Sequence, residues 1–181
     1  MKKKTIFKIL AAAFCVAFMS VGFASCVSDD DPDPLAIKSV NVEYNLNLSQ
    51  TYYDFYDITV KYLDELSQKH EIKVTEAWKY SFSVCPKVAP KNYYFVVTAT
   101  PKAVHPDFDQ DRYVLTPDVQ GKFFCYRNNG ELFAELSSDY YWYTLTNTDV
   151  YTFTAEQFKD YFKASSFRTL MLFEKTVDGK Y

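Results

Sequence analysis

The chain has few of the residues on which common catalytic and nucleotide-binding motifs depend. Its 181 residues include only four glycines and two histidines. His70 and His105 are isolated, so neither belongs to a His-Glu-x-x-His pattern or to another zinc-ligand spacing. The glycines form neither the Gly-x-Ser-x-Gly turn of serine hydrolases nor a phosphate-binding loop. These absences argue against the corresponding enzymes, and we expect no catalytic residues and no cofactor.

A long apolar run is also lacking. The longest one extends from Ile9 to Val21, interrupted by one serine, and follows three lysines at positions 2–4. A membrane-spanning helix needs about 20 such residues. Cations followed by a short apolar run instead predict an export signal that is removed from the mature protein. We therefore expect residues 1–25 to be a signal peptide.

Small residues at the end of this segment lead into a cysteine. Gly22, Ala24 and Ser25 precede Cys26, and Phe23 stands where leucine is usual. The arrangement resembles the lipobox of bacterial lipoproteins, in which the cysteine is acylated and the chain is cut just before it. The resemblance implies a lipid anchor on Cys26, because buried acyl chains hold a protein to a membrane. The alternative is an ordinary secretory peptide with an incidental thiol at Cys26.

The residues after this cysteine are acidic. Residues 26–34 hold four aspartates and two prolines, with no large apolar side chain beyond Val27. Such a segment has nothing to bury and is expected to be a solvated tether. It also resembles the acidic signal that follows the lipid-bearing cysteine in Bacteroidetes-type lipoproteins displayed on the cell surface. That resemblance implies a location at the outer membrane, exposed on the cell surface.

Runs of basic residues are absent. Four of the 20 basic residues lie in the signal, so 16 remain against all 23 acidic residues, a net charge of −7. Such a domain repels phosphate-rich surfaces, and we expect no nucleic-acid partner. The membrane, reached through the lipid, and a glycan or protein ligand are the partners that we expect.

The first half of residues 35–181 alternates between apolar and polar side chains. Apolar residues recur at every second position from Val40 to Leu48, from Ile58 to Tyr62 and from Trp78 to Val84. This period is typical of half-buried antiparallel strands. It predicts an all-β domain, an antiparallel sandwich of immunoglobulin-like type. A small lipocalin-like barrel with an internal cavity is the alternative.

The second half contains signals for one hairpin and one helix. Asn128–Gly130 lies between two apolar segments and predicts a hairpin turn. Thr154 and Gln157 have the spacing of a capping box, and Phe153 and Phe158 that of a hydrophobic staple. These pairs predict one short helix near the C-terminus.

Three parts of the chain together resemble the small sandwich domains of Bacteroidetes surface lipoproteins. They are Asp57–Tyr62 with its return strand, the run through Trp78, and the stretch from Tyr113–Thr116 to Asn129–Gly130. Members of that loose group are mostly uncharacterised or serve as cell-surface binding and assembly modules. The resemblance implies the sandwich fold and a non-enzymatic role in binding a glycan, a protein or an envelope component.

Aromatic residues are abundant, and one run of them is the candidate binding surface. Tyr140, Tyr141, Trp142 and Tyr143 are consecutive. Alternate residues of a strand face opposite sides, so about half of this run would be exposed unless it is covered. Exposed rings can stack on sugars and mark binding sites. The alternatives are that the C-terminal helix covers the run, that a barrel carries an apolar ligand, or that two carboxylates in a cleft act as a minor hydrolase.

Two further groups of residues have alternative interpretations. Cys85 and Cys125 are candidates for a disulfide in an exported protein, or are two buried thiols. Asp107, Asp109 and Asp111 alternate as in a calcium loop, but a glycine needed for the turn of such a loop is missing. We expect no metal site and interpret this segment as a solvated acidic loop.

Overall fold

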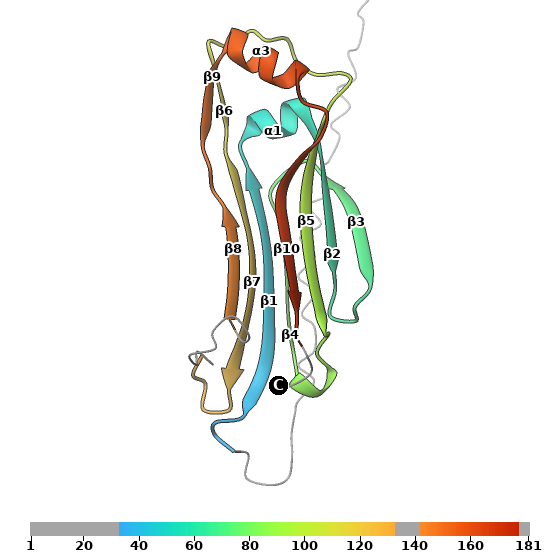
Figure 1. The fold of residues 1–181 in the computed structure, drawn as a ribbon, viewed down its shortest axis with the longest axis vertical. Coiled ribbons are helices and arrows are strands. Elements are labelled where there is room, and N and C mark those ends of the chain that lie inside the picture. The colour runs from blue at the N-terminus through green and yellow to red at the C-terminus, as the bar shows by residue number, and fades with distance from the viewer. Residues whose placement is uncertain (1–32, 133–141, 178–181) are drawn as a thin grey trace, which may run out of the picture.

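The computed structural model describes residues 33–132 and 142–177, which form two antiparallel sheets packed face to face (Figure 1). The elements in chain order are β1 (Ile37–Leu48), α1 (Gln50–Phe55), β2 (Tyr56–Leu63), β3 (Lys69–Val74), β4 (Trp78–Val84), η1 (Pro86–Val88), β5 (Asn92–Pro101), β6 (Arg112–Leu115), β7 (Pro117–Arg127), β8 (Trp142–Asn147), β9 (Tyr151–Thr154), α3 (Ala155–Lys163) and β10 (Arg168–Thr176).

The strands divide between two open sheets of four. Sheet A has the order β4-β1-β7-β8, and sheet B has the order β10-β5-β2-β3. β6 and β9 pair with each other beyond the ends of β7 and β8. Within the described residues no hydrogen-bonded ladder joins sheet A to sheet B. The predicted all-β antiparallel sandwich is therefore confirmed, and the lipocalin-like barrel is excluded.

The period-two pattern determines which side of each strand is buried. In β1, Val40, Val42 and Tyr44 are fully buried, and Asn41 and Glu43 between them lie on the outer face of sheet A. In sheet B, Phe95 and Val97 of β5 are also fully buried. Removing this apolar surface from water is the main stabilising contribution to the fold.

One close contact between the two sheets is made at a glycine. Gly121 pairs with Tyr44 in sheet A, and a Cβ atom added to it would lie 2.6 Å from Cδ2 of Phe173 in sheet B. The Phe173 ring fills the space that any other side chain would need. Gly121 is thus required for contact between the sheets, because it has no Cβ.

Two helices cover one end of the sandwich (Figure 1). The predicted C-terminal helix is confirmed as α3, and both hydrogen bonds of its capping box form. The Thr154 backbone N–H donates to Gln157 Oε1 (2.9 Å), and the Gln157 N–H donates to Thr154 Oγ1 (3.4 Å). The Phe153 and Phe158 rings lie 5.9 Å apart, as the staple predicts. The short helix α1 was not predicted; it buries Tyr52 and Phe55.

The opposite end holds the beginning of the described chain and the predicted hairpin turn. The Arg127 N–H donates to Glu131 O (2.8 Å), and Gly130 has a φ of +86°, which confirms the turn. The Asn128 side chain donates to Asp33 O (2.7 Å) and fastens the first described residue to this turn. Among the described residues, no helix is long and apolar enough to cross a membrane.

Candidate functional site

The aromatic run predicted to bind a ligand lies at the edge of the described residues. Tyr140 and Tyr141 fall outside them, and Trp142 and Tyr143 begin β8, where the backbone register pairs them with Phe124 and Phe123. The side chains of Trp142 and Tyr143 are not among those described. The proposal that this run binds a ligand therefore stays a prediction. The candidate site that the described residues form lies elsewhere, on sheet B.

A hollow of about 770 Å³ lies on the outer face of sheet B, a size typical of ligand sites. It crosses all four strands of the sheet. β2 and β3 contribute Lys61, Leu63, Lys69 and Glu71, whereas β5 and β10 contribute Asn92, Tyr94, Glu174 and Thr176. These residues share one face because they occupy matching positions in the register, such as Lys61 opposite Glu71 and Tyr94 opposite Glu174.

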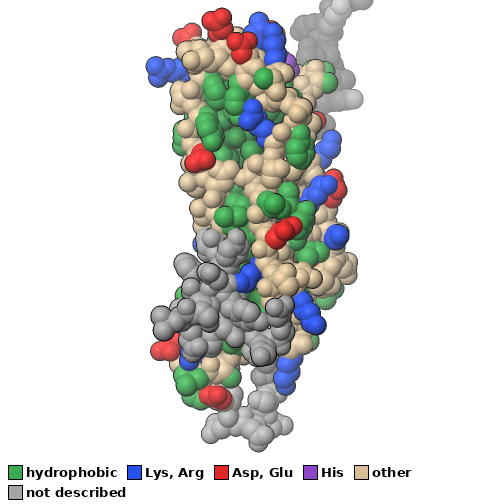
Figure 2. All heavy atoms as spheres, in the orientation of Figure 1, with side chains coloured by type: hydrophobic (Ala, Val, Ile, Leu, Met, Phe, Trp, Pro, Cys, Tyr) green, Lys and Arg blue, Asp and Glu red, His purple; other side chains and the backbone are tan. Residues whose placement is uncertain are grey.

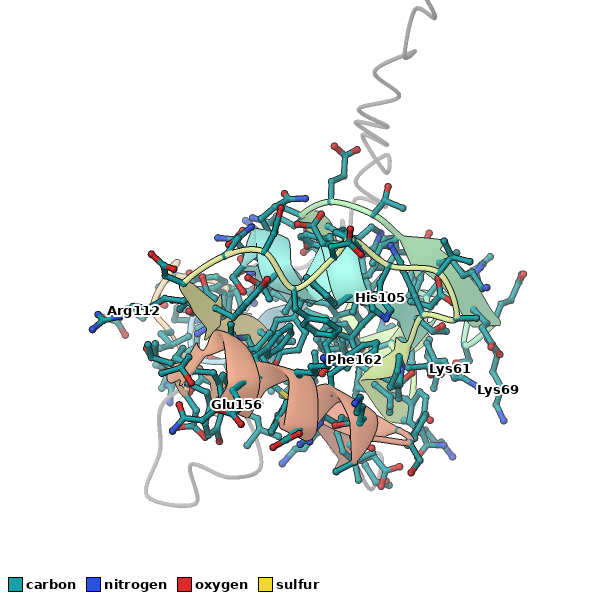
Figure 3. All side chains as sticks on the ribbon, turned by 90° about the horizontal axis from the view of Figure 1, so that it is seen from above. Lys61, Lys69, His105, Arg112, Glu156 and Phe162 are labelled. Atoms are coloured by element: carbon teal, nitrogen blue, oxygen red, sulfur yellow. The ribbon has the colours of Figure 1, made fainter. Side chains whose placement is uncertain are left out.

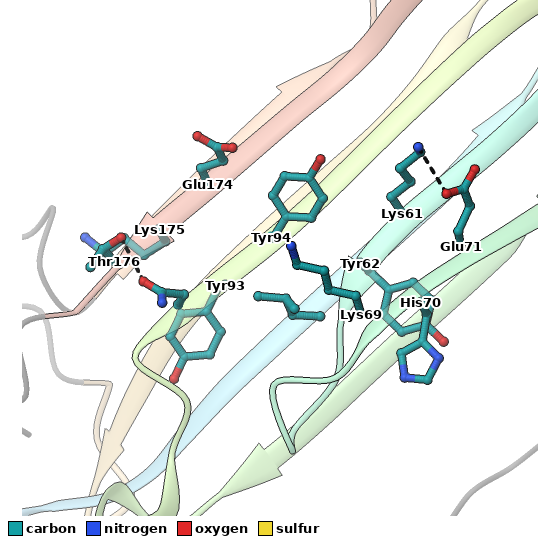
Figure 4. A pocket seen from close by; sticks show the side chains of 12 residues that line it. Lys61, Tyr62, Lys69, His70, Glu71, Tyr93, Tyr94, Glu174, Lys175 and Thr176 are labelled. Carbon is teal, nitrogen blue, oxygen red and sulfur yellow. Dashed lines mark hydrogen bonds and ion pairs between the residues drawn. The ribbon is translucent and has the colours of Figure 1, made fainter.

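The hollow combines one aromatic ring with polar groups of both charges. Figure 4 shows the Tyr94 ring between Glu174 and Lys61 on the same side of the sheet. Lys61 Nζ lies 3.1 Å from Glu71 Oε2, and both side chains are largely exposed. At the far rim, Thr176 Oγ1 donates to Asn92 Oδ1 (3.1 Å). The site therefore offers a flat apolar surface surrounded by hydrogen-bond donors and acceptors.

The other side of the β2–β3 hairpin contributes to an aromatic group that we call the edge cluster, consisting of Tyr44, Tyr62, Trp78 and Tyr80. The Tyr62 ring lies 5.1 Å from Trp78 and 4.7 Å from Tyr80, so it connects sheet B to β4 of sheet A. Tyr44 is fully buried, and the other three are partly exposed. The Tyr80 hydroxyl donates to Glu65 Oε2. Burial and the adjacent Glu65 carboxylate raise the pKa of Tyr80 above its ordinary value, so this hydroxyl keeps its proton.

The turn between β2 and β3 is organised by one carboxylate. Asp64 Oδ1 accepts from the N–H groups of Leu66 (2.9 Å) and Gln68 (2.8 Å), and Oδ2 lies 2.7 Å from His70 Nε2. Desolvation tends to raise the pKa of Asp64, but hydrogen bonds from His70 and the two backbone groups outweigh it and lower the pKa. The His70 ring stacks on Tyr62 at 4.9 Å. Asp64 and His70 thus hold the hairpin turn and are already engaged with each other.

The second histidine is packed among phenylalanines at the helical end. The centroid of the His105 ring lies 4.7 Å from Phe162, 5.0 Å from Phe108 and 5.3 Å from Phe55. In the view onto this end, His105 and Phe162 lie inside the ring of elements, whereas Lys69 and Arg112 extend outward (Figure 3). His105 is therefore part of the packing of this end.

The acidic loop is a solvent-facing segment. Asp107, Asp109 and Asp111 are all exposed. Among the described residues, no group of three or more histidine, cysteine, aspartate or glutamate side chains could hold a metal ion. On the face shown in Figure 2, acidic and basic side chains are interspersed along the molecule and do not gather in one patch of a single charge.

The proposed pairing of Cys85 with Cys125 is wrong. Cys125 is a free, fully buried thiol on the inner face of β7, so it forms no disulfide with Cys85. Burial raises the pKa of Cys125 to about 12, partly offset by Lys175, so the thiol keeps its proton at neutral pH. Cys125 behaves as a small apolar core residue, which was the alternative interpretation of its sequence.

Comparison with known proteins does not assign a family or a ligand to this site. No family model, curated protein or solved structure matches the chain. The sequence signal for the hollow was present but weak: Lys61, Tyr94 and Glu174 are outward members of alternating strands. Sequence could not show that β10 lies beside β5, and this pairing brings Glu174 to Tyr94.

Proposed function

We propose that this protein is a non-enzymatic, lipid-anchored surface lipoprotein whose sandwich binds a charged oligosaccharide of the cell envelope. The observation that carries the proposal is the hollow on sheet B, with the Tyr94 ring at its centre and charged groups around it. Aromatic rings bind the apolar faces of sugars, and the surrounding polar groups fix their orientation. Lys61, Lys69, Glu71 and Glu174 provide charges of both signs, which favours sugars bearing carboxylate or amino groups.

The spacing of the carboxylates supports binding over hydrolysis. Glu71 and Glu174 stand on β3 and β10, three strand spacings apart, so their backbones are separated by about 14 Å. Carboxylate pairs in glycosidases act at about 5–10 Å. Glu71 also forms an ion pair with Lys61. The arrangement suits recognition of a charged ligand better than proton transfer to a glycosidic bond.

The position of the described N-terminal residues is compatible with an anchor at Cys26. The described residues that precede β1 lie at the end opposite α1 and α3 (Figure 1). The seven-residue step from Cys26 to Asp33 can span at most about 25 Å. A lipid on Cys26 would thus hold the sandwich by one end and leave the outer faces of both sheets open to a ligand.

The binding part of the proposal can be tested with one tyrosine variant. The full-length lipoprotein in phosphocholine detergent would be applied to an array of neutral, uronic-acid-containing and amino-sugar-containing oligosaccharides. We expect charged glycans to bind, and Tyr94→Ala to weaken that binding about tenfold or more through loss of ring stacking. Tyr126→Ala removes an exposed tyrosine from sheet A and is the control. Equal binding by wild type and Tyr94→Ala, or no binding to charged glycans, would contradict the proposal.

The anchor part is tested separately. Cys26→Ser should abolish incorporation of labelled fatty acid and release soluble protein from the membrane fraction. Replacing Asp29, Asp30 and Asp31 with alanine should leave lipidation intact and reduce cleavage by protease added outside the cells. Membrane partition that persists in Cys26→Ser would disprove the lipid anchor.

A further inference from the structure

A second hollow lies on the opposite side of the sandwich, on the outer face of sheet A. Its volume is about 410 Å³, within the range of small-molecule sites. Three of its eight lining residues carry side-chain amides, and they come from β1 and β7: Asn45, Asn47 and Gln120. Asp118, Lys79 and Trp78 complete the polar part of the rim.

The strand register explains why these residues meet. Asn45 of β1 pairs with Lys79 of β4 on one side and with Gln120 of β7 on the other. Asn47 pairs with Asp118, one strand spacing away. Neighbouring strands lie about 4.8 Å apart, so the side chains form a compact grid on one face of the sheet. The grid is rigid because β1 is hydrogen-bonded on both of its edges.

The amides of this grid remain available to a ligand. The side chains of Asn45, Asn47 and Gln120 make no hydrogen bond to another described residue. Asn41, on the same face of β1, differs because its amide donates to Ser39 Oγ (3.0 Å) and to Phe124 O (3.5 Å). Each free amide offers two donor hydrogens and one acceptor oxygen, which matches hydroxyl groups that both donate and accept.

The electrostatic character differs from that of the hollow on sheet B. The charged side chains on the rim are Lys79 and Asp118, of opposite sign, so the amides dominate and the local charge cancels. Trp78 lines the edge of the hollow, while its ring lies on the inner side of β4 and packs against Tyr62 at 5.1 Å. A ligand with a net charge gains little here, whereas an uncharged polyol can satisfy every amide.

We propose that this hollow is a binding site for an uncharged sugar residue, held by hydrogen bonds from Asn45, Asn47 and Gln120 to its hydroxyls, with Trp78 at the edge of the site. The site shares no residue with the hollow on sheet B, so it stands whether or not that hollow binds a charged glycan. Together, two sites on opposite faces would allow one sandwich to bridge two segments of polysaccharide.

The test uses the tryptophan of the site as its reporter. The chain has two tryptophans, so a Trp142→Phe background leaves Trp78 as the source of tryptophan fluorescence. The full-length protein in phosphocholine detergent would be titrated with maltohexaose, cellohexaose, mannohexaose and xylohexaose. We expect a saturable change in Trp78 fluorescence with at least one of them. The double substitution Asn45→Ala/Gln120→Ala should weaken that binding about tenfold or more.

Two control variants make the result specific. Asn41→Ala removes an amide that is already hydrogen-bonded, and Tyr94→Ala alters the hollow on sheet B; both should bind the hexasaccharide as the background protein does. The thermal unfolding midpoint of each variant establishes that it is folded. No saturable change with any of the four sugars, undiminished binding by Asn45→Ala/Gln120→Ala, or loss of binding in Tyr94→Ala would each overturn the proposal.

Discussion

The interior of this sandwich contains two aromatic groups that exclude water in different ways. At the helical end, Phe55, Tyr113, Phe158 and Phe162, which we call the helical-end cluster, are each at most 7% exposed. The edge cluster lies between β3 and β4, the unpaired edges of the two sheets, and three of its four rings are partly exposed. The first group is covered by secondary structure. The edge cluster is in contact with solvent, and polar groups from the β2–β3 turn lie along its exposed side.

The difference shows that one end of a sandwich can be stabilised by buried ring packing alone, while rings at one edge remain partly exposed and depend on ionisable groups. The Phe55 ring lies 4.9 Å from Phe158 and 5.6 Å from Tyr113, with both neighbours close to perpendicular to it. These edge-to-face contacts need no hydrogen bond. The edge cluster instead depends on Glu65 for the Tyr80 hydroxyl and on the Asp64–His70 pair beside Tyr62. Stability should therefore be concentrated at the helical end and depend on pH at the edge.

The largest expected effect is the loss of a ring from the helical-end cluster. Phe158→Ala should lower the free energy of unfolding by about 3–5 kcal/mol, because the ring is fully buried and its removal leaves a cavity. Trp78→Ala should cost less, about 2 kcal/mol, since its side chain is partly exposed. Urea unfolding of both variants measures the difference. An equal or larger loss for Trp78→Ala would reverse the comparison between the two clusters.

A smaller effect is expected beside the edge cluster, where Gly121 of sheet A faces Phe173 of sheet B. Gly121→Ala should cost about 1–3 kcal/mol, because its Cβ would overlap the Phe173 ring. Gly130→Ala is the matched control: it has open space around it and should cost only about 1 kcal/mol, from its positive φ. Combining Gly121→Ala with Phe173→Leu should recover part of the loss. Unfolding midpoints that show no recovery would mean that this clash is not the cause.

The cap of α3 is expected to contribute about 1 kcal/mol. Thr154→Ala removes the side-chain acceptor for the Gln157 N–H at the start of the helix that covers the helical-end cluster. Thr154→Ser keeps the hydroxyl and should be close to neutral. Hydrogen exchange of the α3 amides would locate the change. Uniform weakening across both sheets would show that the cap does not act on this end alone.

These residues also show what could be predicted from sequence. The spacing of Thr154 and Gln157 predicted α3 because a cap is a local interaction between residues three apart. Alternation predicted β1, β2 and β4 because one face of each strand is buried. The helix α1 has no such local signal; it buries Tyr52 and Phe55 within six residues and depends on the sandwich around it.

The candidate sites were less predictable for the same reason. Tyr94 and Glu174 are 80 positions apart in the chain and come together through the pairing of β5 with β10. Asn45 and Gln120 meet through the pairing of β1 with β7. Single-sequence patterns indicate which side of a strand faces out, but do not indicate which strands are neighbours. The run Tyr140–Tyr143 was predicted as a binding surface because its aromatic residues are consecutive in the chain, a signal that needs no knowledge of strand pairing.

The last expected effect, about as large as that of the cap and the one that depends on pH, is at the rim of the edge cluster. Asp64→Asn should lower stability by about 1 kcal/mol at pH 7, because the carboxylate accepts two backbone N–H groups and lies against His70. The pKa of Asp64 is lowered in the folded protein from its ordinary value of 3.8. Its ionised form therefore stabilises the fold above about pH 4, and this contribution is lost as the pH falls through the lowered pKa.

The difference between wild type and Asp64→Asn should accordingly be largest from about pH 5 to 7 and shrink as the pH falls below 3.8 towards the lowered pKa of folded Asp64. Urea unfolding of both proteins from pH 3 to 7 measures it. Asp107→Asn changes an exposed carboxylate outside the edge cluster and serves as the control. A constant difference across the pH range would mean that Asp64 acts through its shape and not its charge. The edge cluster would then be closed by packing, as the helical end is.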